Sequence, residues 1–238
     1  MIKIRLAENN DNRKWDEYVF SHDSSGPYHL FAWKEAVETA YRHKSFYLIA
    51  EDEKRAVQGV FPLIHVKAPF LKGVLISLPF CDFGGALAGD DTIRLMLYKK
   101  AVELSESMKV PLEIRCKAED PCIVRNERYC AKTHKSRMLL GLPGSSDILW
   151  DGYKSKLRSQ IRRALKEDLV FRMSNSSLLD DFYEVFCRNM RDLGSPVHSR
   201  LWFASIVESF GDHAQIGVVY KDGMPIGSGI VLCCGNTV

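Results

Sequence analysis

Four cations recur at every fourth position of the segment 153–168, which has the sequence YKSKLRSQIRRALKED. If the segment is helical, these cations form one stripe beside an apolar face of leucine and isoleucine. Like charges at this spacing repel each other by a few tenths of a kcal/mol per pair, so the stripe suits an anionic partner such as phosphate or carboxylate. Arginine grips phosphate through two parallel hydrogen bonds, which makes Arg158 and Arg162 the first candidates. The alternative is a plain solvated face, offset by nearby acidic residues.

Two further segments carry groups that could take part in proton transfer or substrate binding. The polar segment 187–200 contains Arg188, Arg191 and His198, and an imidazole titrates near neutral pH, as a general base requires. The loop 79–85 contains Asp82 and paired glycines ahead of a predicted helix, where backbone N–H groups could hold an anion. The alternatives are a histidine that bridges two helices and a loop that is a simple structural turn.

Several chemistries lack their motifs in this sequence. It contains no HExxH, GxSxG, GxxxxGK[ST] or GxGxxG pattern. The seven cysteines form no CxxC pair, and their odd number favours reduced thiols over a disulfide framework or a zinc site. We therefore expect no metal and no covalent serine mechanism.

Composition places the chain among ordinary globular proteins, with 46% hydrophobic and 26% charged residues. A net charge of +3 argues against binding of DNA over the whole surface but allows a local basic patch. No signal peptide opens the sequence, and no apolar run approaches the roughly 20 residues of a membrane span. A cytoplasmic protein is the expectation.

The elements that must position these residues alternate between helices and strands, which predicts an α/β fold. Periodicity predicts helices over 31–41, 91–108, 153–168, 178–193 and 201–210, and a short one after residues 10–12. Strands are predicted at 2–6, 46–50, 57–66, 74–78 and 112–116, with another within 129–140 and a hairpin at 215–232.

Two hairpins of this pattern can be aligned, residues 47–64 with residues 215–232. Two predicted helices precede each hairpin, and Gly59 falls on Gly227 at an offset of 168 residues. The pattern suggests a tandem repeat with domains at 1–144 and 145–238. The counterpart of Gly84 would then fall at position 252, so the second unit is expected to be incomplete. The alternative is that any two hairpins look alike.

Three parts of the sequence carry a family resemblance: the basic helix, the segment RNMRDLGSPVHSRLWFASIVESFGD, and the pair FAWKEAVETAY and FPLIHVKAPFLKGVLISLPFCDFGGALAG. They resemble FemAB-like proteins, including the subfamily associated with exosortase and exopolysaccharide loci. The resemblance covers essentially the whole chain. It implies two tandem GNAT-like units with mixed sheets flanked by helices, in a bacterial acyltransferase. The implied reaction moves an acyl or aminoacyl group to an amine of a peptidoglycan, other cell-envelope or exopolysaccharide precursor.

The resemblance also implies roles for particular residues. Trp33, Lys34 and Arg158 or Arg162 would bind an anionic glycan or lipid-linked precursor, and the proton acceptor would be His198, Asp82 or water. The co-substrate would be aminoacyl-tRNA or acyl-CoA, with no permanently bound cofactor. Asp168 departs from the glycine usual in the family, and the arm inserted in some members between positions corresponding to 194 and 211 is absent, which weakens a tRNA-dependent interpretation. The alternatives are a binding module or remnant that holds an anionic precursor, and an acyl-CoA-dependent sugar acyltransferase.

Overall fold

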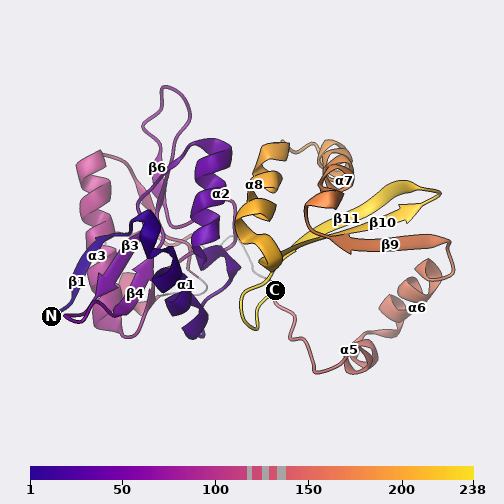
Figure 1. The fold of residues 1–238 in the computed structure, drawn as a ribbon, viewed down its shortest axis with the longest axis horizontal. Helices are drawn as coiled ribbons and strands as arrows, with labels where there is room; N and C mark the ends of the chain where they lie inside the picture. Colours follow the sequence, from indigo (N-terminus) through magenta and orange to yellow (C-terminus); the bar gives the residue numbers. More distant parts are fainter. Residues whose placement is uncertain (117–119, 125–128, 133–137) are drawn as a thin grey trace. The chain divides into compact units, whose positions relative to one another are not determined.

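The computed structural model describes residues 1–116, 120–124, 129–132 and 138–238. Contacts within the chain divide it into two compact units (Figure 1). The first contains Met1–Lys132, His198–Ala214 and Val231–Val238, and the second contains Thr133–Val197 and Gln215–Ile230. The predicted boundary at residue 144 separates the two copies of the repeated sequence pattern, and it remains a prediction. Within the described residues, no helix is long and apolar enough to cross a membrane.

The first unit is built on two mixed or antiparallel sheets flanked by helices (Figure 1). The larger sheet has the order β1-β3-β4-β7 with antiparallel pairing throughout. The smaller sheet has the order β2-β5-β6-β8, with β6 and β8 parallel. The strands are β1 (Lys3–Leu6), β2 (Lys44–Ser45), β3 (Leu48–Glu51), β4 (Val57–Phe61), β5 (Ile64–Val66), β6 (Val74–Ile76), β7 (Leu87–Ala88) and β8 (Leu112–Glu113). The helices are α1 (Asn12–Ser21), α2 (Phe31–Tyr41), α3 (Asp91–Met108), α4 (Pro121–Val124) and α8 (Arg200–Phe210).

Helix α3 covers one face of the larger sheet with the stripe that its sequence predicts. Ile93, Leu97 and Ala101 are buried in one cluster with Leu48 and Ala50 of β3. The helix begins where expected, because the Asp90 side chain accepts a hydrogen bond from the Ile93 amide at 2.8 Å. Each fully buried aliphatic side chain of this kind stabilises the fold by roughly 1.5–3 kcal/mol.

The second unit carries a three-stranded sheet of order β11-β10-β9. Its strands are β9 (Leu169–Ser174), β10 (Ala214–Lys221) and β11 (Met224–Leu232), and its helices are α5 (Ser146–Gly152), α6 (Ser155–Ala164) and α7 (Leu179–Asp192). Helix α6 is shorter than the predicted 153–168 because the chain turns after Ala164. Four short 3-10 helices complete the described elements: η1 (Asn9–Asp11), η2 (Pro27–His29), η3 (Ser176–Leu178) and η4 (Gly211–His213).

The strand order and register repeat along the chain, as the tandem fold predicts. In each repeat a strand, two helices and a hairpin follow one another, and the first strand pairs antiparallel with the first hairpin strand. Leu6 pairs with Leu48, and 168 residues later Ser174 pairs with Ile216. Identical register in both sheets is the structural mark of a duplicated α/β unit.

Side-chain contacts correct the alignment of the hairpins by one residue. In the first unit Glu51 of β3 binds Arg5 of β1 and Lys14 of α1. In the second unit Tyr220 of β10 lies under Arg172 of β9 and donates a hydrogen bond to Asp181 of α7. These two sets occupy the same places only if β9 is shifted by 167 residues and β10 by 169. Because one strand shifts by one residue less than 168 and the other by one residue more, their pairing is unchanged. The new alignment also places matching residues on the strand face that packs against the helix in both units.

Other predicted elements differ in detail. The strand expected at 112–116 is shorter, since β8 ends at Glu113. The strand expected within 129–140 is not found at 129–132 or 138–140, and its remaining residues lie outside the described ones. Helix α1 begins at Asn12 as expected, but the Asp11 side chain before it makes no cap bond and pairs with Arg5 instead.

Candidate active site

The glycine loop between β6 and β7 has a backbone that its surroundings hold in place. Leu78 and Phe80 have φ values of 68° and 65°, in the left-handed region where bulky residues are strained. The Cys81 thiol donates to the Phe83 carbonyl at 3.3 Å, and Arg115 Nη1 donates to the Cys81 carbonyl at 3.1 Å. These bonds fix the direction in which Phe80 and Asp82 leave the loop.

Gly84 allows the close approach of this loop to the end of β6. A Cβ atom at Gly84 would lie 2.4 Å from the Ser77 carbonyl oxygen and 2.6 Å from Leu78 Cβ. We expect Gly84→Ala to lower the free energy of unfolding by about 1–3 kcal/mol, measured by urea denaturation. Gly89→Ala is the matched control, because its nearest neighbour would be 3.7 Å away. Equal unfolding midpoints for both variants would contradict this account.

His198 lies against the glycine loop and the end of α2. The Tyr41 hydroxyl is 2.6 Å from His198 Nδ1. The Phe80 ring is 5.2 Å from the His198 ring and 4.8 Å from the Tyr41 ring. The Trp202 ring of α8 lies 5.5 Å from Phe80 and completes this wall. The structure therefore brings the predicted base His198 to the same loop that carries Asp82.

Two histidines border this aromatic wall, and burial acts on both. Partial burial lowers the pKa of His198 below its ordinary value of 6.5. The pKa of His43, whose ring stacks on Tyr41, is lowered by burial and by the nearby His65. Both imidazoles are therefore neutral near pH 7. If Nδ1–H of His198 donates to the Tyr41 oxygen, Nε2 is the proton acceptor, as a general base requires.

The other predicted residues of the first unit have different surroundings. Trp33 is buried, donates from Nε1 to the Pro79 carbonyl at 3.3 Å, and packs edge-on against Trp202. Lys34, expected from its position to be a surface residue, is only 7% exposed and pairs with Glu38 and Asn9. That expectation was wrong, because the Lys34 ammonium lies over the Phe31 ring, 4.9 Å from the ring centroid, and is held there by its polar partners. Asp82 is exposed on the glycine loop.

The four predicted arginines belong to the second unit. Arg158 is half-buried, with Nη1 3.9 Å from Asp151, and Arg162 stacks over the Trp150 ring at 5.4 Å. Arg188 and Arg191 lie on α7 and pair with Glu184 and Asp192. Arg158 and Arg162 thus share one helix face, and the structure leaves the proposed binding roles of all four as predictions.

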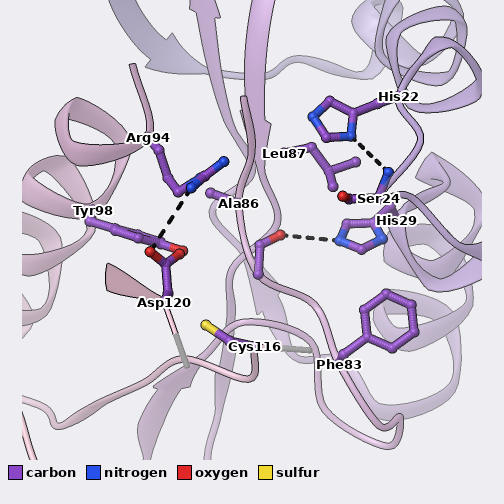
Figure 2. Close-up of a pocket in the computed structure, with 11 residues that line it drawn as sticks. His22, Ser24, His29, Phe83, Ala86, Leu87, Arg94, Tyr98, Cys116 and Asp120 are labelled. Atoms are coloured by element: carbon purple, nitrogen blue, oxygen red, sulfur yellow. Dashed lines mark hydrogen bonds and ion pairs between the residues drawn. The ribbon is translucent and has the colours of Figure 1, made fainter. Parts of the chain in front are cut away.

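A cavity of the first unit lies beside β7, apart from the aromatic wall around His198 (Figure 2). Its cavity volume is about 190 Å³. Arg94, Tyr98 and Asp120 lie on one side of the segment that carries Ala86 and Leu87, and His22 and His29 lie on the other (Figure 2). None of these residues was singled out by sequence, since their spacing matches no motif.

The polar groups of this cavity are engaged with one another. Tyr98 donates to Asp120 Oδ2 at 2.7 Å, and burial raises the pKa of Tyr98 far above its ordinary value. Burial also raises the pKa of the Cys116 thiol to about 11, so the thiol is protonated at neutral pH. His22 Nδ1 accepts from the Ser24 amide, which places the proton on Nε2 beside the Ala88 carbonyl. The Tyr98 bond links α3 to Asp120 and the His22 contact links the end of α1 to β7, and we assign these contacts no reaction step.

The helix N-terminus after the glycine loop does not suit a bound phosphate. Asp90 already accepts from the first turn of α3, and Asp91 adds a second carboxylate there. The amides of Gly84 and Gly89 donate to the carbonyls of Arg115 and Gln58. The loop is thus a structural turn, which was the alternative to an anion cradle.

Sequence reasoning missed Tyr41, His43 and Phe80, which form the wall around His198. Tyr41 ends α2, and Arg42 follows it in the left-handed conformation that turns the chain. The only sequence signal for this wall was that a tyrosine and a histidine flank the end of a helix. Their meeting with residue 198 depends on the packing of α2 against α8, which no local pattern encodes.

The fold is that of tandem GNAT-like units. The family model of the acetyltransferase (GNAT) domain matches residues 152–238. Among solved structures, FemX is similar over 91% of this chain with a TM-score of 0.64 and 18% sequence identity. The FemAB-like resemblance is therefore confirmed at the level of the fold. This chain spans 57% of the FemX chain.

Two acetyltransferase structures match part of this chain with lower TM-scores. One from Trypanosoma brucei matches 60% of this chain and all of its own length, with 14% identity and a TM-score of 0.41. An aminoglycoside 6'-N-acetyltransferase from Acinetobacter baumannii matches 58% of this chain and 99% of its own, with 11% identity and a TM-score of 0.37. Among curated protein sequences, none matches the chain. The similarity to FemX is the one that bears on the tandem fold.

Proposed function

We propose that this chain belongs to an N-acyltransferase that moves an acyl or aminoacyl group to an amine of a cell-envelope or exopolysaccharide precursor. The observation that carries the proposal is the GNAT domain match at 152–238 within a duplicated fold like that of FemX. The neutral imidazole of His198 in its aromatic wall supports it, since transfer to an amine requires a proton acceptor.

The amine nitrogen of the acceptor attacks the carbonyl carbon of the donor, an amide bond forms, and the thioester or ester bond breaks. The amine loses one proton, which His198 takes and which finally protonates the leaving thiolate or alkoxide. Backbone N–H groups are the expected donors to the developing oxyanion. Asp82 and water remain alternative proton acceptors.

The acyl donor is proposed to be acyl-CoA or aminoacyl-tRNA, bound as a co-substrate. The GNAT domain match favours acyl-CoA. The carboxylates at the start of α3 argue against holding a donor pyrophosphate at the first glycine loop, so the donor is assigned to the second unit. A cytoplasmic location fits either donor and is part of the proposal.

A single incubation tests this function and its alternatives. The purified chain is mixed with acetyl-CoA or with charged tRNA, and with a nucleotide-linked amino-sugar peptide or a glycan amine, and products are identified by mass spectrometry. An amide product with either donor supports the proposal, and the productive donor identifies the class. Acceptor binding without any product would overturn it in favour of a binding module.

The arginines of α6 are proposed to bind the phosphates of the acceptor. We expect Arg158→Ala to weaken acceptor binding roughly tenfold or more, the usual loss for a charge-assisted hydrogen bond. The melting temperature should hardly change, because no side chain of α6 is buried. Isothermal titration calorimetry with a soluble nucleotide-linked acceptor measures the effect, and Arg163→Ala on the same helix is the matched control. Unchanged affinity in Arg158→Ala would exclude this binding role.

A further inference from the structure

Strand β9 lies at the outer edge of the three-stranded sheet of the second unit (Figure 1). Its inner edge pairs with β10 along the whole strand, and in the described part of the chain no strand pairs with its outer edge. The side chains of β9 are nevertheless mostly apolar, and Val170, Phe171 and Met173 are 51%, 61% and 55% exposed. A free row of backbone N–H and C=O groups with exposed apolar side chains favours pairing with another strand.

The matching strand of the first unit shows how such an edge is protected. Strand β1 is also the edge strand of its sheet, and it carries the charged residues Lys3 and Arg5. At the offset of 167 residues Arg5 corresponds to Arg172, but Lys3 corresponds to Val170. Lysine on an edge strand opposes pairing with another chain. Strand β9 therefore lacks one of the two charges that protect β1.

The outer edge of β9 stays free however the sheet of the second unit is extended. In the first unit the fourth strand, β7, joins β4, on the side of the sheet away from β1. By the same pattern a further strand of the second unit would join β11 and leave β9 at the edge. The partner that suits this edge is a strand, because the backbone donors and acceptors of β9 lie in a row at strand spacing. We therefore expect the partner strand to belong to another molecule.

We propose that the partner is β9 of a second copy of this chain, paired antiparallel across a two-fold axis at Phe171. In this register Phe171 lies opposite Phe171 of the second copy, and Leu169 lies opposite Met173. These three side chains share the face away from α7, so every pair on that face is apolar. On the other face Val170 lies opposite Arg172, which keeps the two arginines apart. A two-fold contact of this kind is self-complementary and closes at two chains.

Other positions of the two-fold axis suit the strand less well. An axis at Arg172 would place the two guanidinium groups opposite each other, and like charges directly opposite are destabilising. An axis at Val170 or at Met173 would pair only half of the six-residue strand. Charge and strand length thus select the axis at Phe171, and they select the second copy because its strand supplies the apolar partners that Phe171 and Met173 require.

Oxidative cross-linking tests the register directly. Phe171→Cys should form a disulfide-linked dimer, since the Cα atoms of directly opposed residues lie about 4.5–5.5 Å apart. The exposed Cys130 is first replaced by serine in every variant. Met173→Cys is the matched control, because Met173 is similarly exposed on the same face but would lie about 13 Å from its own copy. We expect a dimer band on non-reducing gels in Phe171→Cys alone.

Sedimentation velocity of the full chain over a range of concentrations measures the association itself. Val170→Lys introduces the residue that β1 carries and places it opposite Arg172 of the second copy, twice in each dimer. We expect the dissociation constant of the dimer to rise roughly tenfold. Met224→Lys is the matched control, because it adds the same charge at a similarly exposed position on β11, and it should leave the constant unchanged. Circular dichroism confirms that each variant is folded.

Dimers that cross-link in Phe171→Cys alone and weaken in Val170→Lys alone support the pairing of β9 with its copy. A wild-type chain that stays monomeric at the highest concentration overturns the proposal, as does equal cross-linking in the two cysteine variants. Equal weakening by Met224→Lys would indicate head-to-tail pairing of β9 with β11 and would also overturn it. These measurements require no transfer activity, so their outcome is independent of the proposed function.

Discussion

Replacing His198 with alanine is expected to lower the rate of amide formation by roughly 10²–10⁴-fold, the usual contribution of a positioned general base. The fold should survive, because His198 is only partly buried and precedes α8, whose cap is the Ser199 side chain. The measurement is kcat/KM for the amine acceptor of the proposed reaction. A change of less than threefold would exclude His198 as the proton acceptor and leave Asp82 or water.

The pH dependence of the wild-type rate provides a second readout. Because burial lowers the pKa of His198, the imidazole stays neutral to a lower pH than an exposed histidine would. The rate should therefore be full at neutral pH and fall only as the pH drops through the lowered pKa, below 6.5. His198→Ala should lack that acid limb.

Tyr41→Phe distinguishes a positioning role from a catalytic one. The Tyr41 oxygen lies 2.6 Å from His198 Nδ1, so its loss should free the imidazole to change tautomer and orientation. We expect a decrease in kcat of about tenfold, of the size of one neutral hydrogen bond, together with a displaced acid limb. Asp82→Asn serves as the matched test of the rival carboxylate and should leave the profile unchanged.

Replacing Asp11 with alanine is expected to produce the largest loss of stability, about 3 kcal/mol. Asp11 is 4% exposed and accepts hydrogen bonds from Arg5 Nη1 at 2.6 Å and from the Glu8 amide at 2.7 Å. Lys14 and Glu51 complete the network. Breaking one member of a buried ion network leaves its partners uncompensated, which costs about 3–5 kcal/mol. The lower end applies because Arg5 and Lys14 remain about 30% exposed.

The same network predicts sensitivity to acid. The Arg5 guanidinium holds the pKa of Asp11 well below its usual range, and it also lowers the pKa of Glu51. A depressed folded-state pKa gives stability that is present above the unfolded value of about 4 and is lost as the pH falls below it. Urea unfolding between pH 7 and pH 2 should show a steeper loss in the wild type than in Asp11→Ala.

Asp23→Ala is the control for this stability prediction, because Asp23 is an exposed carboxylate of the same unit. Its effect should stay within about 0.5 kcal/mol. If Asp11→Ala destabilises no more than Asp23→Ala, the network is a solvated surface cluster and contributes little.

Much of the fold follows from local patterns. Alternation predicted β1, and apolar spacing predicted α3 to its observed bounds. The repeat was visible because the hairpins at 48–61 and 214–232 keep the same strand and turn chemistry. Periodicity reports which side of an element is apolar, and that predicts element type and order. The hairpin alignment suggested the tandem architecture but left open that any two hairpins look alike.

The candidate site was predicted only in part, because its residues come from segments far apart in the chain. His198 was a candidate because imidazole titrates near neutrality, and that property belongs to the residue type alone. Its partners Tyr41 and Phe80 come from segments far apart in the chain, so only the packing of α2 on α8 and the strained loop at Phe80 reveals them. The basic stripe of α6 could be predicted because it depends only on residue spacing along one helix.

The sequence by itself therefore determined most of the elements and the chemical types available on each, and it suggested their duplication. The tertiary structure decided which of them meet. It buried Lys34 beside Phe31, tied Asp11 to Arg5, shifted the hairpin alignment by one residue and placed His198 against Tyr41. Helical and strand periodicity is a local property of the backbone, whereas burial and pairing depend on contacts between residues far apart in sequence, and these contacts set the pKa of His198.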